Sequence, residues 1–208
     1  MRCVIFSGAD IHDYDFVASF LRSDDFVICA DSGLRHAEKL GITADLLIGD
    51  FDSAEEINPD LYKAIVTLPC EKDDTDTFAA AKRAADLGAK EALIFGALGT
   101  RLDHTLGNIA ALEYLCGRGV SARIIGEHNE IGIISDETVR IKKRDNCYLS
   151  LIPLDRMLHG VYISGVKYPL DNADVSRAST LTVSNEITAD FADVTVKEGT
   201  ALYIISHD

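Results

Sequence analysis

The chain has 208 residues, 47% of them hydrophobic, and a formal net charge of −14. The hydrophobic content is sufficient for a folded core, and the negative charge argues against binding to nucleic acid or to an anionic membrane surface, which both attract basic proteins. No stretch approaches the length of a membrane span, roughly 20 apolar residues, and the apolar run at residues 3–6 is too short for a signal peptide. The five cysteines contain no C-x-x-C pair, which favours reduced thiols. We therefore expect a cytoplasmic protein.

The first part of the chain alternates strand and helix patterns. Short apolar runs predict buried parallel strands at residues 3–6, 26–30, 46–48, 64–68 and 92–95. Helical patterns cover residues 14–21, 31–40, 74–87 and a segment that begins at residue 103. The last three helices have candidate N-caps at Asp31-Ser32, at Asp74 or Thr75, and at Asp103. The last helix has an apolar face at spacings of three and four, made by Leu102, Leu106, Ile109, Leu112 and Cys116.

After residue 126 the pattern changes to short strands without a convincing helix. The strands are expected at residues 131–135, 138–141, 147–152, 161–164, 180–183, 191–196 and 201–206. Strands at this density are typical of an antiparallel sandwich or barrel. We therefore predict an α/β fold in which residues 1–126 form a mostly parallel sheet with flanking helices, followed by an antiparallel β-sandwich domain at residues 127–208.

Two acidic loops follow predicted strands of the first part. Gly49-Asp50-Phe51-Asp52-Ser53 follows residues 46–48, and Lys72-Asp73-Asp74-Thr75-Asp76 follows residues 64–68. The carboxyl ends of parallel strands meet at the edge where open α/β sheets bind ligands. Carboxylates crowded there repel one another unless a cation lies among them, and oxygen ligands favour Mg²⁺, which usually arrives with substrate phosphates. The alternative is that these acids are turn residues and helix caps, which explains one or two of them comfortably.

A third loop after a predicted strand carries glycines and an arginine. Gly96-Ala97-Leu98-Gly99-Thr100-Arg101-Leu102-Asp103-His104 is neither a P-loop nor the dinucleotide fingerprint, because its glycine spacing differs from both. The glycines let the backbone approach a ligand, and Arg101 is suited to bidentate binding of phosphate. A surface ion pair for Arg101 and a capping or core role for His104 are the alternatives. Together the three loops predict a Mg²⁺-dependent enzyme that acts on a nucleotide.

In this order, these loops resemble the thiamine pyrophosphokinase family. Ala30-Asp31-Ser32-Gly33 belongs to the same resemblance, as do Gly165-Val166-Lys167-Tyr168-Pro169-Leu170 and Ser184-Asn185-Glu186 in the second half. The resemblance implies a homodimer with the active site at the subunit interface. It also implies transfer of pyrophosphate from ATP to the hydroxyl of thiamine, with release of AMP. Some members stack a Trp on thiamine, and since this chain has no Trp, Tyr168 or another aromatic of the second half is expected there.

The resemblance also implies roles for individual residues. The ligands of Mg²⁺ would be Asp50, Asp52 and Asp76. The catalytic residues would be Asp50, Asp73, Asp76, Arg101 and Asp103. The residues that bind ATP or the second substrate would be Asp31, Ser32, Gly33, Lys72, Thr75, Gly99, Arg101, His104, Ser184 and Asn185. Either Asp73 or Asp103 could accept the proton of the thiamine hydroxyl, and the sequence does not choose between them.

Two other functions stay open at this point. One is another Mg²⁺-dependent transferase or kinase that uses a nucleotide on the same scaffold, which release of ADP in place of AMP would reveal. The other is a sensor that binds a nucleotide or thiamine without turnover. The complete set of Asp50, Asp52 and Asp76 argues against a sensor, because binding alone would not require so many metal ligands.

Overall fold

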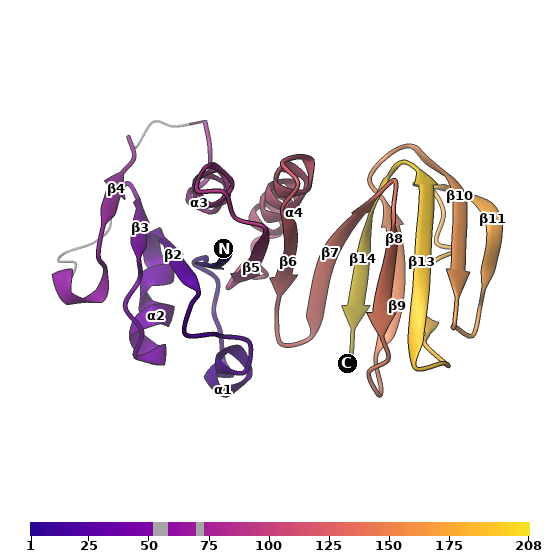
Figure 1. The fold of residues 1–208 in the computed structure, drawn as a ribbon, viewed down its shortest axis with the longest axis horizontal. Coiled ribbons are helices and arrows are strands. Elements are labelled where there is room, and N and C mark those ends of the chain that lie inside the picture. Colours follow the sequence, from indigo (N-terminus) through magenta and orange to yellow (C-terminus); the bar gives the residue numbers. More distant parts are fainter. Residues whose placement is uncertain (52–57, 70–72) are drawn as a thin grey trace. The chain divides into compact units, whose positions relative to one another are not determined.

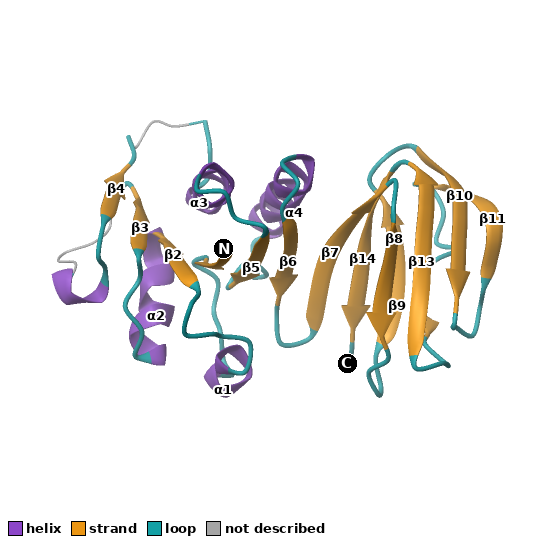
Figure 2. Ribbon diagram, viewed as in Figure 1, coloured by secondary structure: helices purple, strands orange, loops and turns teal. Residues whose placement is uncertain are grey.

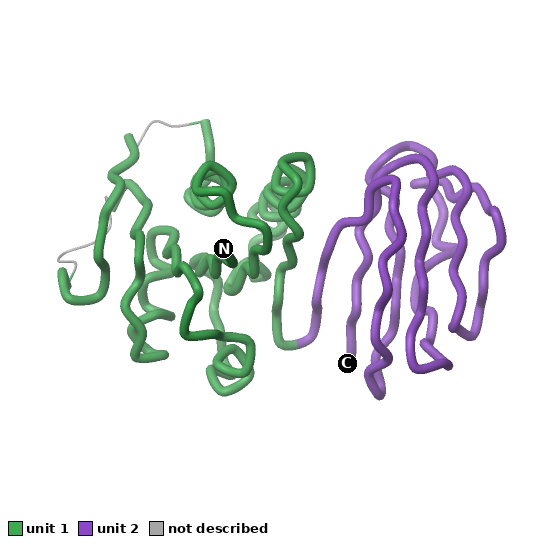
Figure 3. Tube along the Cα trace, in the orientation of Figure 1, with its two compact units in different colours: residues 1–127 green, residues 128–208 purple. Residues whose placement is uncertain are grey.

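The chain divides into two units, one built from alternating strands and helices and one from strands. The computed structural model describes residues 1–51, 58–69 and 73–208. The first unit covers Met1–Glu127 and the second covers His128–Asp208, drawn in green and purple in Figure 3. Among the described residues, every α-helix belongs to the first unit, and the second unit is built from strands and turns.

The first unit alternates strands and helices along the chain (Figure 1). Its elements are β1 (Arg2–Phe6), α1 (Tyr14–Ala18), β2 (Phe26–Ala30), the 3₁₀ turn η1 (Asp31–Gly33), α2 (Leu34–Leu40), β3 (Leu46–Gly49), the 3₁₀ turn η2 (Pro59–Leu61), β4 (Ile65–Thr67), α3 (Asp76–Asp86), β5 (Glu91–Phe95), α4 (Leu102–Gly117) and β6 (Ser121–Ile125). These strands lie in the order β6-β5-β1-β2-β3-β4, and all of these neighbours pair in parallel. The predicted parallel sheet is thereby confirmed.

Helices cover both faces of this sheet, as Figure 2 shows. Successive side chains of a strand point to opposite faces. Val4 and Phe6 of β1 belong to a hydrophobic cluster that also contains Val17 of α1 and Ala37 of α2. Helix α3 lies against β1, β2 and β3 on the other face, and α4 lies against β6. Because both faces are covered, the strands at the centre of the sheet are continuous apolar runs, which is why the sequence reveals them.

The strand order reverses at β1. From β1 the chain proceeds through β2, β3 and β4 on one side, and then returns to place β5 and β6 on the other side. The loops that leave β1 and β5 therefore diverge at the carboxyl end of the sheet. Open α/β sheets bind their ligands at such a switch point.

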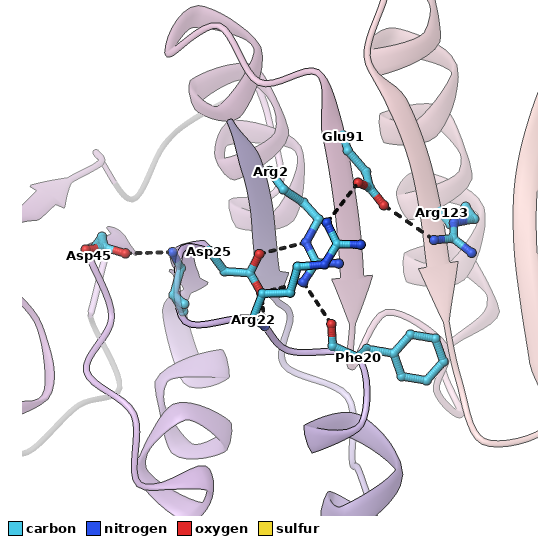
Figure 4. A network of polar contacts seen from close by, with 8 residues as sticks. Arg2, Phe20, Arg22, Asp25, Asp45, Glu91 and Arg123 are labelled. Atoms are coloured by element: carbon cyan, nitrogen blue, oxygen red, sulfur yellow. Dashed lines mark hydrogen bonds and ion pairs between the residues drawn. The ribbon is translucent and has the colours of Figure 1, made fainter.

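The opposite, amino end of the sheet carries a network of ion pairs (Figure 4). Arg2 donates to both carboxylate oxygens of Asp25 at 2.6 and 2.7 Å, and to the Phe20 carbonyl at 2.8 Å. Glu91 lies 3.9 Å from Arg22 and 3.5 Å from Arg123. These contacts join the segments at which β1, β2 and β5 begin and tie them to β6.

The helix starts follow the predictions in part. Thr75 caps α3 and accepts a hydrogen bond from the Phe78 N–H at 3.2 Å, as predicted. Helix α4 begins after Arg101, so the prediction that Asp103 is its N-cap is wrong, and Asp103 lies in the first turn. The η1 turn delays the start of α2 to Leu34, and α1 ends at Ala18 rather than at residue 21.

Two predicted buried surfaces are exposed. Leu102 and Leu106 of α4 are 68% and 57% exposed, because the sheet receives the neighbouring stripe of this helix, which includes Ala111 and Leu115. Strand β4 is exposed along its whole length, with Ile65 43% exposed. It is the last described strand in the order and pairs with β3 alone, so it is an edge strand rather than a buried one.

The second unit contains two antiparallel layers. Its strands are β7 (Asn129–Ser135), β8 (Thr138–Lys142), β9 (Tyr148–Pro153), β10 (Met157–Ser164), β11 (Leu170–Ser176), β12 (Asn185–Glu186), β13 (Phe191–Glu198) and β14 (Thr200–Ser206). One layer has the order β12-β9-β14-β7 and the other has the order β11-β10-β13-β8. A single cluster with members from both layers, including Leu151, Val161, Val194 and Tyr203, forms the core. The predicted β-sandwich is confirmed.

Two details of this unit differ from the prediction. Residues 180–183 form a turn and not a strand. The strand Leu170–Ser176 was not predicted, because its sequence LDNADVS has no apolar alternation. It lies at the end of its layer, where one neighbouring strand and one buried residue, Val175, suffice to hold it.

The cysteines of the sheet behave as the sequence predicts. Cys3 and Cys29 are free and buried, and burial raises the pKa of their thiols to about 11 and to about 12. Thiols with such pKa values are inert at neutral pH. In the part of the chain that the structure describes, no helix is long and apolar enough to cross a membrane.

Candidate active site

A cleft of about 640 Å³ opens at the carboxyl end of the parallel sheet, at its switch point. The segments that follow β1, β2 and β5 line it, together with the first turns of α3 and α4. The strand register explains this convergence. Phe6 pairs with Cys29 and Phe95, and Ala30 pairs with Ile48, so the residues that leave these strands emerge at one edge.

Most of the predicted residues of the first unit lie in this cleft. Those that line it are Asp31, Ser32, Thr75, Asp76, Gly99, Arg101 and His104. Among the described residues of the first unit, the predicted ones that do not line it are Gly33, Asp50, Asp73 and Asp103. Two further predicted residues, Asp52 and Lys72, lie outside the described residues.

The loop after β1 lines the cleft and was not predicted as part of a site. Its backbone continues the pairing with the β5 side, since the Ser7 N–H donates to Phe95 O and the Ala9 N–H donates to Gly96 O, both at 2.8 Å. The Thr77 hydroxyl of α3 donates to Ser7 Oγ at 2.9 Å, which ties the loop to the start of that helix. The signal was present in the sequence, because Ser7-Gly8 follows an apolar run in the same way as the three loops that were recognised.

The segments after β2 and β3 lie against each other. Asp31 has a left-handed backbone, with φ of +47°. A Cβ on Gly49 would lie 3.1 Å from the Asp31 Cα, so the end of β3 brings Asp50 beside a residue that lines the cleft. A Cβ on Gly33 would lie 2.1 Å from the Phe6 carbonyl oxygen. Gly33 is therefore required for the packing of η1 on β1, and its predicted contact with a ligand stays untested.

The loop after β5 is fixed by a buried asparagine that was not predicted as part of the site. Asn108 is 7% exposed, and its Nδ2 donates to the Ala97 carbonyl at 2.8 Å. The signal in the sequence was a polar residue four positions before Leu112 on the stripe that faces the sheet. Gly96 has φ of +63°, and a Cβ there would lie 2.5 Å from the Ser7 carbonyl oxygen, so the two loops of the switch point approach as closely as glycine allows.

Arg101 enters the cleft already paired with an acid. Its guanidinium donates to Asp103 at 2.7 and 3.3 Å, and both side chains are 68% exposed. This hydrogen bond, assisted by one from the His104 N–H, lowers the pKa of Asp103 to about 2. An exposed ion pair contributes little to stability, so an incoming phosphate can take over the guanidinium at small cost.

The start of α3 has more acidic side chains than a helix N-cap requires. Thr75 supplies the cap, and Asp74 accepts from Lys82 at 2.6 Å. Asp76 is half-buried, lines the cleft and is not needed as a cap. Within the described ranges, no group of three or more His, Cys, Asp or Glu side chains forms a ready metal site. The carboxylates of Asp50 and Asp76 fit Mg²⁺, which is commonly held by one or two carboxylates, waters and substrate phosphates rather than by a complete protein cage.

The two predicted residues of the second unit differ in exposure. Ser184 is exposed and has a left-handed backbone, with φ of +58°. Asn185 is 6% exposed, and its amide bonds the backbone of Tyr168 twice, donating to the carbonyl at 2.8 Å and accepting from the N–H at 3.1 Å. Tyr168 itself is 60% exposed. Asn185 thus fixes the position of the exposed ring beside it.

A parallel sheet with flanking helices and a cleft at its switch point, followed by a β-sandwich, defines a two-unit α/β protein with a candidate ligand site in its first unit. Comparisons with known proteins agree with this class. Residues 17–124 match the family described as "Thiamin pyrophosphokinase, catalytic domain", and residues 136–201 match "Thiamin pyrophosphokinase, vitamin B1 binding domain". The chain belongs to the thiamine pyrophosphokinase family, as its sequence predicted.

Individual relatives are similar over most of the chain. The thiamine pyrophosphokinase of Bacillus subtilis (strain 168) is 33% identical over 186 residues, which are 87% of each chain. A crystal structure of thiamine pyrophosphokinase from Bacillus subtilis has a TM-score of 0.89 at 27% identity and covers 100% of both chains. A crystal structure of thiamin pyrophosphokinase from Geobacillus thermodenitrificans has a TM-score of 0.86 at 29% identity and covers 100% of this chain and 98% of its own.

Proposed function

We propose that the chain transfers pyrophosphate from ATP to the hydroxyl of thiamine in the cleft of the first unit, giving thiamine diphosphate and AMP. The observation that carries this proposal is the convergence of seven predicted residues on one cleft, in a chain of this family. A different transferase on the same scaffold, or a sensor without turnover, is not favoured, because the catalytic and vitamin-binding regions both match one family.

The nucleotide is proposed to bind with its phosphates near the first turns of α3 and α4. A helix N-terminus carries partial positive charge and free N–H groups, which suits an anion. Gly99 is exposed and offers close approach to the backbone, and Arg101 offers a planar guanidinium for two phosphate oxygens. These features supply locally the positive charge that a chain with a net charge of −14 lacks overall.

Mg²⁺ is proposed to be held by Asp50 and Asp76, together with Asp52. When bound, the ion would neutralise negative charge on the phosphates of ATP. Asp50 follows β3 beside Asp31, and Asp76 begins α3, so the two described ligands come from segments that meet at the carboxyl edge of the sheet.

The reaction requires attack of the thiamine hydroxyl on the β-phosphorus, so that AMP leaves. Negative charge grows on the oxygen that leaves, and Arg101 is proposed to stabilise it. An efficient proton acceptor has a pKa near the working pH. Asp103, with a pKa of about 2 in its ion pair, is a weak acceptor. A phosphate that takes over Arg101 would remove this ion pair, so both predicted candidates, Asp73 and Asp103, are kept in the proposal.

Thiamine is proposed to lie against the Tyr168 ring, with Ser184 contacting its pyrimidine. An exposed aromatic face suits a flat cationic ring. Asn185 contributes by holding Tyr168, because its amide is already engaged with the backbone of that residue.

The site is proposed to form at the interface of a homodimer. Large apolar side chains left exposed by the second unit, such as Leu181 at 61% and Phe191 at 45%, are consistent with a further covered surface.

Product analysis tests the reaction. The protein is mixed with ATP, Mg²⁺ and thiamine, and the nucleotides and thiamine esters are separated by chromatography. We expect AMP and thiamine diphosphate in equal amounts, and no product when EDTA removes the divalent cation. ADP together with thiamine monophosphate would identify a kinase that transfers one phosphate and would overturn the proposal.

Mixing two inactive variants tests the shared site. Asp50→Asn damages the metal site, and Asn185→Ala damages the thiamine site through Tyr168. If each active site draws on two chains, a mixture regains part of the activity that neither variant has alone. A wild-type protein that sediments only as a monomer under assay conditions, with full activity, would exclude the shared site.

A further inference from the structure

A histidine lies buried beneath the loop that follows β1. His36 of α2 is 1% exposed. Its Nε2 lies 2.9 Å from the Ala9 carbonyl oxygen, and its Nδ1 lies 2.8 Å from the Tyr14 hydroxyl. Its ring also lies under the β5 loop, because a Cβ on Gly96 would be 3.2 Å from His36 Nε2. One side chain thus supports both loops that diverge at the switch point.

These contacts determine the tautomer of the ring. A carbonyl oxygen can only accept, so Nε2 carries the hydrogen and donates it to Ala9. Nδ1 of the neutral ring then accepts from the Tyr14 hydroxyl. The charged groups around the ring are Arg35 and Lys39 of α2 and Asp10 of the β1 loop, and Tyr14 is the titratable group from α1. Burial lowers the pKa of His36, and the two nearby cations act in the same direction, while the hydrogen bond to Ala9 and the charge of Asp10 oppose them. The net shift of the pKa is downward, so the neutral ring is favoured.

Neighbouring residues of α2 hold neighbouring carbonyl groups of the loop. Arg35 Nη2 donates to the Gly8 carbonyl at 2.6 Å, and His36 holds the Ala9 carbonyl. The N–H of Ala9 is bonded to Gly96 on the other side, so Ala9 is fixed through both of its backbone groups. A carbonyl that accepts from a fully buried ring points into the protein. The carbonyl oxygen of Ala9 therefore does not face the cleft, where its partial negative charge would repel a phosphate.

We propose that His36, in its neutral form with the hydrogen on Nε2, is a positioning residue for the nucleotide. It holds the loop after β1 in the conformation that admits an anionic phosphate chain, and Tyr14 fixes its tautomer. This inference rests on the proposed function, in which the nucleotide binds in the cleft of the first unit. It assigns to the loop after β1, and to two residues that do not line the cleft, a role in the affinity for ATP.

Three variants test the inference in the full chain. His36→Leu removes the donor and leaves the Ala9 carbonyl without its partner, and His36→Gln keeps an amide N–H that can reach this carbonyl. Tyr14→Phe removes only the hydroxyl. We expect His36→Leu to raise the KM for ATP by at least about tenfold, with kcat and the KM for thiamine within about twofold. His36→Gln should restore the KM for ATP to within about threefold of wild type, and Tyr14→Phe should lie between the two.

A second measurement separates positioning from loss of stability. Calorimetric titration with an ATP analogue that carries a methylene group between the α- and β-phosphorus follows binding without turnover, and the affinity should fall in His36→Leu as the KM rises. Ile124→Ala creates a cavity at a fully buried position of β6 and serves as the control, since it should lower the melting temperature without changing the affinity for the analogue.

The outcomes distinguish this inference from the proposed function. A wild-type protein that makes no AMP and thiamine diphosphate would refute the proposed function. A wild-type protein that makes both, with unchanged ATP affinity in His36→Leu or equal loss in His36→Gln and His36→Leu, would refute the role of His36 alone. If His36→Leu does not fold, His36→Gln and Tyr14→Phe are compared instead. Tyr14→Phe should weaken the affinity for ATP clearly and His36→Gln should not, and equal affinities in the two variants would refute the role of His36.

Discussion

The two ends of the parallel sheet carry their charges differently. At the amino end, Arg2 and Asp25 form a bidentate ion pair in which the side chains are 10% and 2% exposed (Figure 4). At the carboxyl end, Arg101 and Asp103 form a pair of the same kind in which both side chains are 68% exposed. Charges at the amino end are already satisfied by one another, whereas those at the carboxyl end can be taken over by a ligand. We therefore expect substitutions at the amino end to affect stability and those at the carboxyl end to affect activity.

The largest effect is expected from Asp76→Asn at the carboxyl end. The change removes a proposed ligand of Mg²⁺ at nearly constant shape and should lower kcat/KM by at least about a thousandfold, since a bound metal ion supplies several kcal/mol of transition-state stabilisation. The melting temperature should fall by only a few degrees, because Thr75 supplies the side-chain cap of α3 and an acid in the first turn contributes about 1 kcal/mol or less.

Asp74→Asn is the matched control, made two residues earlier in the same turn. Asp74 pairs with Lys82 and does not line the cleft among the described residues, so this variant should keep kcat/KM within about threefold. Steady-state rates of AMP release and thermal melting measure both variants. Similar rates in the two would mean that the acids at this turn only stabilise the helix.

Breaking the ion pair of Arg2 and Asp25 at the amino end should lower the stability and leave the activity unchanged. Asp25→Asn leaves the Arg2 guanidinium nearly buried without its counter-charge, and should lower the free energy of unfolding by about 3 kcal/mol. The KM values and kcat should not change at temperatures where the variant is folded, because this network lies at the end of the sheet opposite the cleft. Urea unfolding followed by circular dichroism measures the first quantity, and AMP release measures the second.

The second unit supplies a control with the same bond geometry. Arg140 donates to both oxygens of Asp193 at 2.7 and 3.0 Å, but these side chains are 67% and 37% exposed. Asp193→Asn should therefore cost no more than about 0.5 kcal/mol. Equal losses for Asp25→Asn and Asp193→Asn would show that burial does not govern the contribution of these pairs.

A smaller effect is expected from Asp103→Asn at the carboxyl end. If Asp103 only pairs with Arg101, its replacement frees the guanidinium for phosphate and lowers the KM for ATP by up to about fivefold, the value of an exposed ion pair. The kcat should stay within about tenfold of wild type, because removal of a general base costs roughly a hundredfold or more. Initial rates over a range of ATP concentrations test this, and a loss of kcat beyond a hundredfold would make Asp103 the proton acceptor after all.

Elements and residues were predictable to the extent that their sequence signal is local. The central strands of the first unit are continuous apolar runs, and Thr75 with the alanines that follow it has a clear helix-start pattern. The loops at the carboxyl edge were recognised because each follows an apolar run, although the run before the second loop forms the exposed edge strand β4. The β11 strand was missed because an edge strand with one buried residue needs no apolar alternation.

Roles that depend on tertiary contacts could not be predicted in the same way. His36 and Asn108 are single polar residues in helical patterns, and the sequence does not reveal which carbonyl group each one holds. The motif that contains Asn185 could be recognised, but the engagement of its amide with the Tyr168 backbone depends on a contact across 17 residues. In each case the signal is a polar residue at a position that the fold buries, and burial follows from packing that periodicity alone does not specify.

The smallest effect concerns the pH dependence of stability and separates His36 from the amino-end network. Burial lowers the pKa of His36 below its ordinary value of 6.5. Above pH 6.5 both the folded and the unfolded chain carry a neutral ring. As the pH falls below 6.5, the unfolded chain binds a proton that the folded chain does not, so the free energy of unfolding falls until the pH reaches the lower pKa of the folded state. Wild type should therefore lose stability between pH 6.5 and that lower pKa.

The variant His36→Gln should lose less stability in the same window, because glutamine does not titrate. Melting temperatures of the two proteins, measured from pH 8 to about pH 5 at constant ionic strength, give the comparison, and the other histidines cancel in the difference. The Asp25→Asn variant should keep the pH dependence of wild type although its stability is lower at every pH, because its substitution leaves His36 in place. Parallel curves for wild type and His36→Gln would show that the ring titrates alike in the folded and unfolded states, contrary to a neutral histidine held between Ala9 and Tyr14.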